Sequence, residues 1–203
     1  MSISYLTAAQ IGSLSSTVVS GWSTTELASL NSTQLAAVST TAIAALDSTQ
    51  LGALTSTEVK GLTTSQIPVL STSFVFNSPQ LAVLSAGQLN SLTSTQVQDF
   101  DSTHIGLLLT SQIDGFTSTT LNNFTTTQIQ ELASSQLTGL TASQVSGFSA
   151  TLFAEFDDTQ IDEFSSSQLG ALSTTNLNSL DSTAVQGLSS TQLKGLTTSQ
   201  VSG

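Results

Sequence analysis

Residues 47–54 read Asp-Ser-Thr-Gln-Leu-Gly-Ala-Leu, and residues 55–62 repeat the pattern as Thr-Ser-Thr-Glu-Val-Lys-Gly-Leu. With its positions numbered 1 to 8, this octad recurs along almost the whole chain. Position 1 is Ser, Thr, Asp or Asn in every octad except those that begin at Leu109 and Ala133. Position 4 is mostly Gln, and positions 5 and 8 are apolar wherever the octad reaches them. A repeat of this regularity decides the fold.

The octad carries a helix-start signal. A polar residue at position 1 followed three residues later by Gln or Glu is a capping box, and the apolar residues on either side, such as Leu46 and Leu51, are spaced as a hydrophobic staple. Positions 5 and 8 then lie on one face of a helix, whereas in a strand they would point to opposite faces. One continuous helix is excluded, because eight residues at about 100° each turn the apolar stripe by roughly 80° per octad. We therefore predict one short helix per octad.

Helices this short are marginal alone, since isolated helices below about 12 residues are unstable in water. Each must bury positions 5 and 8 against neighbouring octads, which predicts a solenoid. Most departures from Gln fall on alternate octads, at His104, Thr120, Leu152 and Ala184. This rhythm predicts 16-residue coils of two octads each, with the amide side chains forming a ladder. The alternative fold is a β-solenoid with 16-residue coils.

The repeat also divides the chain into segments. Pro68 and Pro79 flank the one place where the register breaks, and they predict a kink, a bulge or a short strand there. Ile3 and Tyr5 are placed to cover the first core layer. The expected segments are a lead-in or cap at 1–6, octads at 7–70, a register break at 71–76, and octads at 77–203 with the last one incomplete.

The charge and the amino-acid composition exclude several classes of binding partner. Two lysines and no arginine stand against 13 carboxylates, for a net charge of −11, so nucleic acid and anionic membrane surfaces are poor partners. The chain has no cysteine, which excludes disulfides and thiolate metal sites. No apolar stretch is long enough to span a membrane, and no cleavable signal peptide is visible.

Few residues are candidates for chemistry. The densest acidic run, Asp157, Asp158, Asp162 and Glu163, is a weak Ca²⁺ candidate of the right oxygen chemistry but without EF-hand spacing. The alternative is a solvated face, since aspartates are favoured at helix starts. His104 is the only histidine and is interpreted as a cap variant. No serine has a plausible general base, so we predict no enzymatic activity and no cofactor.

The units Leu54-Thr-Ser-Thr-Glu-Val-Lys-Gly-Leu62 and Leu132-Ala-Ser-Ser-Gln-Leu-Thr-Gly-Leu140 resemble the Leu-Thr-x-x-Gln-Ile/Leu-x-x-Leu arrays of large bacterial secreted and surface adhesin-like proteins. The resemblance implies a non-enzymatic extracellular or cell-surface structural protein, such as an adhesin stalk, a surface layer or a self-assembling filament. Head-to-tail or lateral self-association is expected. The alternative is a binding module that presents a regular Ser/Thr/Gln face to a repetitive ligand such as polysaccharide or ice.

The octad pattern also predicts how much each position contributes to the stability of the fold. If position 5 is fully buried, Leu51→Ala costs about 2–5 kcal/mol. If Gln50 serves only as a cap, Gln50→Ala costs nearer 0.5–2 kcal/mol, by a rough estimate.

Overall fold

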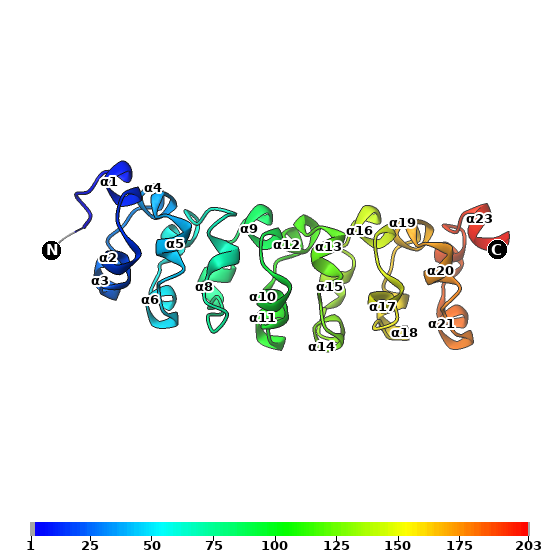
Figure 1. The fold of residues 1–203 in the computed structure, drawn as a ribbon. Coiled ribbons are helices and arrows are strands. Elements are labelled where there is room, and N and C mark those ends of the chain that lie inside the picture. The colour runs from blue at the N-terminus through cyan, green and yellow to red at the C-terminus, as the bar shows by residue number, and fades with distance from the viewer. Residues whose placement is uncertain (1–2, 203) are drawn as a thin grey trace. The chain divides into compact units, whose positions relative to one another are not determined.

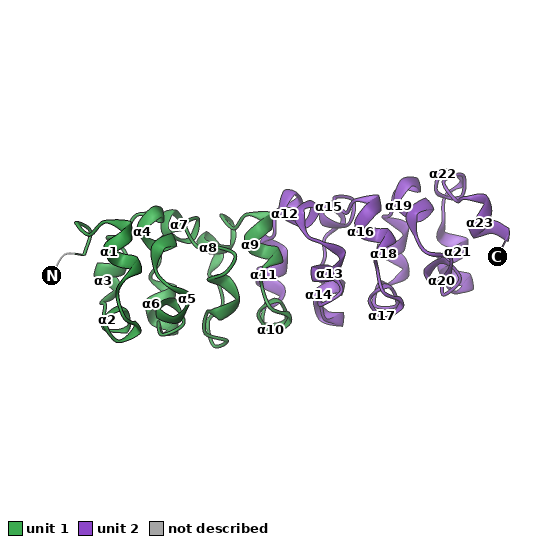
Figure 2. Cartoon of the chain, turned by 45° about the horizontal axis from the view of Figure 1, so that its top comes forward, with its two compact units in different colours: residues 1–99 green, residues 100–203 purple. Residues whose placement is uncertain are grey.

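The computed structural model describes residues 3–202, and the regular elements within that range are all short helices. No strand occurs among these residues, so the helical solenoid is confirmed and the β-solenoid alternative is not supported. The chain divides into two compact units, residues 1–99 and 100–203 (Figure 2).

The described part of the first unit, residues 3–99, contains ten α-helices and one 3₁₀ helix, each within one octad. They are α1 Ala8–Gly12, α2 Ser16–Ser20, α3 Thr24–Leu27, α4 Ser32–Ala37, α5 Thr40–Ile43, α6 Ser48–Gly52, α7 Ser56–Val59, η1 Ile67–Val69, α8 Ser78–Leu81, α9 Ala86–Asn90 and α10 Ser94–Gln98.

The second unit continues the series with α-helices alone in its described part. They are α11 Ser102–Leu107, α12 Thr110–Gly115, α13 Ser118–Leu121, α14 Thr126–Gln130, α15 Ser134–Leu137, α16 Ala142–Ser146, α17 Ala150–Phe153, α18 Asp158–Asp162, α19 Ser166–Ala171, α20 Thr174–Leu177, α21 Ser182–Gly187, α22 Ser190–Leu193 and α23 Thr198–Ser202.

The capping box predicted from the sequence starts most of these helices. At α6, the Asp47 carboxylate accepts from the Gln50 amide at 2.8 Å, and Gln50 Oε1 accepts from the Asp47 amide at 2.9 Å. At Leu109 and Ala133 the N-cap side chain has no oxygen, but the glutamine three residues later still accepts from the N-cap amide. Half of the box is enough to begin a helix where the other half is missing.

Within each unit, helices stack on the helix three octads away. In the first unit α1 packs on α4, α2 on α5 and α3 on α6; in the second, α16 packs on α19 and α19 on α22 (Figure 1). The solenoid therefore has 24-residue coils, each made of three octads. The predicted coil of two octads is wrong, because the departures from Gln at alternate octads do not follow the stacking.

The position-4 glutamines join successive coils. Gln66 Nε2 donates to the carbonyls of Leu35 and Val38 at 2.9 and 2.7 Å, which lie 31 and 28 residues earlier. Gln136 in the second unit bonds at the same offsets, to Ile105 and Leu108. Since a helix end leaves its last carbonyls without partners, each glutamine satisfies one helix end in the coil before it while capping its own helix. The ladder runs from amide to backbone, not from amide to amide as expected.

The register break occupies one side of a coil. Residues 71–76 form a turn in which Phe74 and Phe76 are buried, with ring centroids 5.0 Å apart in an edge-to-face arrangement. Across it, Gln80 reaches the carbonyls of Leu51 and Leu54, at offsets of 29 and 26 residues. Both offsets are two residues shorter than the 31 and 28 found elsewhere, because the segment 71–76 has six residues in place of eight. The ladder of glutamine hydrogen bonds therefore continues past the register break. Near the two prolines the chain forms η1 and α8, not the short strand that was one expectation.

The core consists of the residues at positions 5 and 8, as predicted, and most are almost fully buried. Coils approach closely where position 7 is glycine: a Cβ on Gly61 would lie 2.3 Å from the Ser32 carbonyl oxygen, and one on Gly195 would meet Ser166 in the same way. In the lead-in, Ile3 is buried, but Tyr5 is exposed and covers no core layer, contrary to expectation. The carbonyls of Ser4 and Leu6 instead accept from Gln34 Nε2.

Because Gln50 bonds to the carbonyls of Ser20 and Trp22 as well as to its own N-cap, its loss leaves three backbone groups without partners. We therefore expect Gln50→Ala to cost about 2–4 kcal/mol, above the value for a cap alone and close to that of Leu51→Ala. Urea unfolding followed by circular dichroism measures both.

The control is Gln10→Ala, because Gln10 closes the same capping box on the exposed surface of the first coil. Its replacement should cost only a rough 0.5–1 kcal/mol. Equal losses for Gln50→Ala and Gln10→Ala would show that the bonds between coils contribute nothing.

Candidate functional site

The four acidic residues of the Ca²⁺ candidate lie along α18 and do not converge. Asp157 is the N-cap, with its carboxylate accepting from the Gln160 amide at 2.8 Å, and Asp158 follows in the first turn. Glu163 lies at the other end of the helix and accepts from the Ser134 hydroxyl. Residues 3–202 contain no group of three or more His, Asp or Glu side chains placed to hold a metal ion. The sequence run is thus distributed around one short helix.

His104 replaces the position-4 glutamine of its octad. Asp101 accepts from the His104 amide at 3.0 Å, and the imidazole Nδ1 lies 2.6 Å from the same carboxylate. These hydrogen bonds hold the pKa of Asp101 below its ordinary value. The imidazole also stacks on Phe100, with centroids 5.7 Å apart. The histidine closes the start of α11, as the cap interpretation predicts.

Glu58 is a carboxylate built into the glutamine ladder. Its side chain is 1% exposed, and Oε2 accepts from the Thr55 amide at 2.6 Å. Oε1 is buried and has no hydrogen-bond partner in the described part of the chain. By the 28- and 31-residue offsets of the ladder, this oxygen takes the place from which a glutamine would donate to the carbonyls of Leu27 and Leu30. Burial raises the pKa of Glu58, since the ionised form loses its hydration.

The last coil exposes the apolar side chains that earlier coils bury. At position 5, Leu193 is 44% and Val185 46% exposed, whereas Leu169 in the preceding coil is fully buried. These side chains border a groove of about 370 Å³. We call this surface the terminal coil face; the groove is lined by Leu177, Asn178, Leu180, Val185, Leu188, Leu193 and Leu196.

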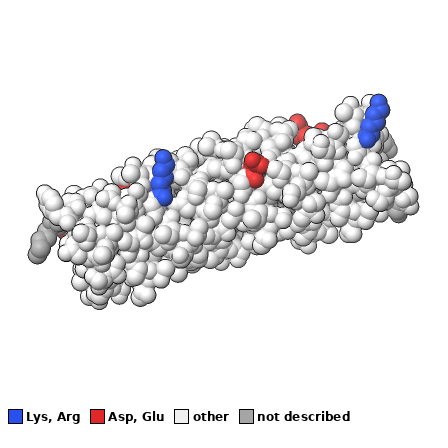
Figure 3. Space-filling view, turned by 90° about the horizontal axis from the view of Figure 1, so that it is seen from above, with Lys and Arg blue, Asp and Glu red and all other residues white. Residues whose placement is uncertain are grey.

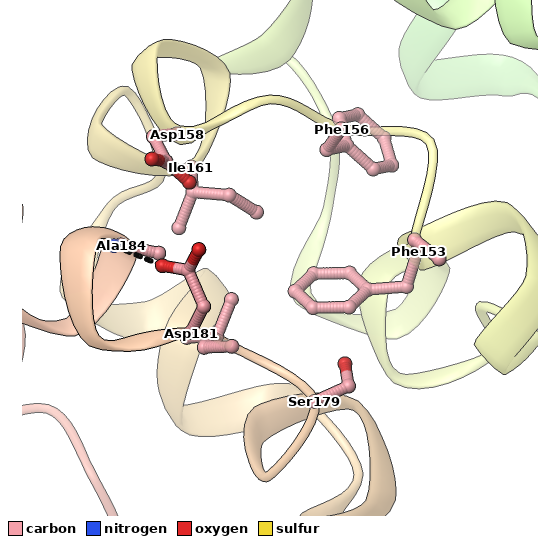
Figure 4. A pocket seen from close by; sticks show the side chains of 9 residues that line it. Phe153, Phe156, Asp158, Ile161, Ser179, Asp181 and Ala184 are labelled. Atoms are coloured by element: carbon pink, nitrogen blue, oxygen red, sulfur yellow. Dashed lines mark hydrogen bonds between the residues drawn. The ribbon is translucent and has the colours of Figure 1, made fainter.

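A second cavity, of about 190 Å³, lies where α17, α18 and α21 meet (Figure 4). The rings of Phe153 and Phe156 form one wall, with centroids 6.1 Å apart, and the carboxylates of Asp158 and Asp181 lie on the other side. Ala184 stands at the position where most octads have glutamine. We call this cavity the Ala184 pocket.

Charged side chains are few on the viewed face and stand apart from one another (Figure 3). No helix among residues 3–202 has both the length and the apolar character needed to cross a bilayer.

Sequence reasoning anticipated head-to-tail contacts but not the residues that form the terminal coil face, and it missed the Ala184 pocket. The face depends on which neighbour covers each octad, and one octad does not reveal that. The pocket did leave a signal, because Ala184 is one of the departures from Gln. Its meaning depends on which earlier carbonyls a position-4 side chain reaches, and only the structure provides that pairing.

Residues 27–64, and again residues 43–75, match the family model described as the ALTTAQ repeat. This similarity supports a repeat-array protein. No curated protein and no solved structure gave a match to the chain.

Glu58→Gln should stabilise the fold by about 1–3 kcal/mol at neutral pH, because an amide can donate where a carboxylate oxygen has no partner. The pKa of Glu58 is raised in the folded chain, so the wild type loses stability as pH rises from near the ordinary value of 4.5. The variant lacks this loss, and the difference between the two proteins should shrink towards acid pH. Urea unfolding at neutral and acid pH measures it.

The matched control is Glu26→Gln. Glu26 also occupies position 4, but hydrogen bonds from Ser23 lower its pKa, so its replacement should give no gain at neutral pH. A similar gain from both variants would rule out the buried carboxylate as the cause.

Proposed function

We propose that this chain is a non-enzymatic extracellular structural repeat protein, part of a stalk, surface layer or filament that grows by head-to-tail association. The observation that carries the proposal is the interface between coils, where one coil supplies carbonyls and apolar side chains and the next supplies amide donors, so that further coils can be added in the same way. The resemblance to secreted adhesin-like arrays supports an extracellular place, and the absence of cysteine is compatible with it.

A further coil of octads is the natural occupant of the terminal coil face. Within the chain, the side chains at positions 5 and 8 are covered by the coil that follows, and the carbonyls at these positions accept from the glutamines of that coil. The terminal coil face offers both features, with Leu193 and Val185 open. Full burial of such a side chain contributes about 1.5–3 kcal/mol.

The first coil presents the complementary surface. Its position-4 residues are Gln10, Val18 and Glu26, which occupy the places from which later coils contact the coil before them. Val18 is an apolar side chain at this position and is 49% exposed. Because the two surfaces differ, association of copies is heterologous and extends into a fibre when it does not close into a ring.

The purified chain should therefore sediment as a concentration-dependent series of oligomers in analytical ultracentrifugation. Leu193→Asp places a charge on the terminal coil face and should shift the distribution to monomer. Leu193 is already partly exposed, so the change should leave the circular dichroism spectrum intact.

Leu109→Asp is the control, because Leu109 is a 52% exposed leucine at a helix start and not on the terminal coil face. It should leave the oligomer series unchanged. A wild-type chain that stays monomeric at every concentration, or equal loss of association in both variants, contradicts the proposal.

A second candidate function is binding to a repetitive ligand such as polysaccharide or ice. The position-2 and position-3 hydroxyl residues favour it, since pairs such as Thr24 with Thr25 and Ser48 with Thr49 are exposed. The glutamines contribute little to this surface, because most are buried in the ladder. The face would consist of serine and threonine.

This candidate predicts retention on insoluble polysaccharide that is weakened when exposed threonines are replaced. The pair Thr24→Val and Thr49→Val removes two hydroxyls with little change in shape. Retention that is unchanged by this double substitution, or absent in the wild type, would count against glycan binding while leaving the structural proposal intact.

A further inference from the structure

The Ala184 pocket lies beside a position where the ladder lacks a glutamine. The glutamines Gln66, Gln136 and Gln168 donate through Nε2 to carbonyls 31 and 28 residues earlier. The same offsets pair position 184 with the carbonyl oxygens of Phe153 and Phe156. Alanine has no amide to place there, and a pocket of about 190 Å³ borders this position, where Ala184 itself is 2% exposed.

The polar atoms around this cavity mostly accept hydrogen bonds. One oxygen of Asp181 accepts from the amides of Thr183 and Ala184, which leaves the second carboxylate oxygen for another donor. The Ser179 hydroxyl donates to the Asn176 carbonyl at 2.7 Å, so its lone pairs remain for accepting. Asp158 adds a second carboxylate, and the nine lining residues include no cation. The chemistry of the pocket calls for a donor that carries positive charge.

The apolar wall specifies the rest of the ligand. Phe153 and Phe156 border the cavity opposite the carboxylates, and Ile161 lies beside Asp158 (Figure 4). A cation near the face of an aromatic ring gains about 0.5–1 kcal/mol at an exposed site, and its carbon chain can pack on the ring. The volume is below the roughly 300–1,000 Å³ of pockets for drug-sized ligands, so it suits a single small group.

We propose that the Ala184 pocket binds a primary alkylammonium group, with its nitrogen in the place of the missing glutamine Nε2. An ammonium has three N–H donors. Two can meet the carbonyls of Phe153 and Phe156, and the third can meet Asp158 or Asp181. The net charge of −11 raises the concentration of cations near the surface. The group comes from a free amine or from a lysine side chain of another protein, and both share this chemistry.

The test is titration of the full 203-residue chain with n-butylammonium, followed by amide chemical shifts in NMR. Saturable shifts are expected at Phe153, Phe156 and Ala184, with millimolar affinity typical of so small a ligand, of order 1 mM. 1-Butanol, which has the same chain length without the charge, should produce no saturable shifts there. N-acetyl-lysine amide tests the lysine source: binding tighter than butylammonium favours a protein partner, and weaker binding favours a free amine.

Two variants decide whether the pocket is the site. Ala184→Gln restores the ladder and fills the cavity, so it should abolish binding and raise the Tm. Asp158→Asn keeps the cavity and should weaken binding about two- to fivefold. Asp114→Asn, an exposed carboxylate elsewhere in the second unit, is the control and should change nothing.

The proposal is overturned if Ala184→Gln folds and binds butylammonium like the wild type, or if 1-butanol binds equally well. It is also overturned if the shifts spread over acidic residues in general, with Asp158→Asn and Asp114→Asn behaving alike. The pocket and the groove of the terminal coil face share Leu180, so the titration is repeated with Leu193→Asp, in which the shifts at Phe153 and Ala184 should persist.

Discussion

The glutamine amide that links one coil to the next is the interaction on which the solenoid depends. Helices of four to six residues leave most of their backbone groups without intrahelical partners, and burying those groups unpaired would cost more than the core can offset. One glutamine side chain provides partners both for an amide at a helix start and for carbonyls at a helix end. In Gln136, Oε1 accepts from the start of its own helix at 2.9 Å, while Nε2 donates to carbonyls of an earlier helix end at 2.8 Å.

The glutamine hydrogen bonds and the apolar packing therefore both stabilise the same interface between successive coils. Position 4 bonds backwards to the preceding coil, and positions 5 and 8 are covered by the following coil, as the contrast between Leu169 and Leu193 shows. Each coil has one surface that supplies donors and one that supplies carbonyls and apolar side chains. Stability in such an array is a sum over neighbouring pairs. Departures such as Glu58 and Ala184 then have local effects, one an unpartnered oxygen and the other a cavity.

The capping box, the short helices and the core positions could all be predicted, because each is a relation within one octad. The coil size could not, since the spacing of Leu51 and Leu54 specifies a face but not the helix it meets. The alternation through Leu152 and Ala184 pointed to coils of two octads, yet these positions lie on different sides of a coil that contains three. The four acidic residues of the Ca²⁺ candidate do not gather, because Asp157 caps the start of α18 while Glu163, at its other end, accepts from Ser134. The terminal coil face and the Ala184 pocket could be recognised only once the structure showed which residues of one coil pair with which residues of the next.

The three sides of a coil use the same residue code, and this has a consequence for how such arrays change in length. An octad that caps, stacks and donates in the same way on every side can be followed by any other octad. The six-residue side at 71–76 shows that even a shortened member keeps the ladder in step. Replication slippage or recombination that adds or removes one octad would turn everything downstream by a third of a coil and still leave each helix on a compatible neighbour. The array can therefore be lengthened by one octad of eight residues at a time. The unit that is added in evolution is smaller than the 24-residue coil that is the unit of the structure.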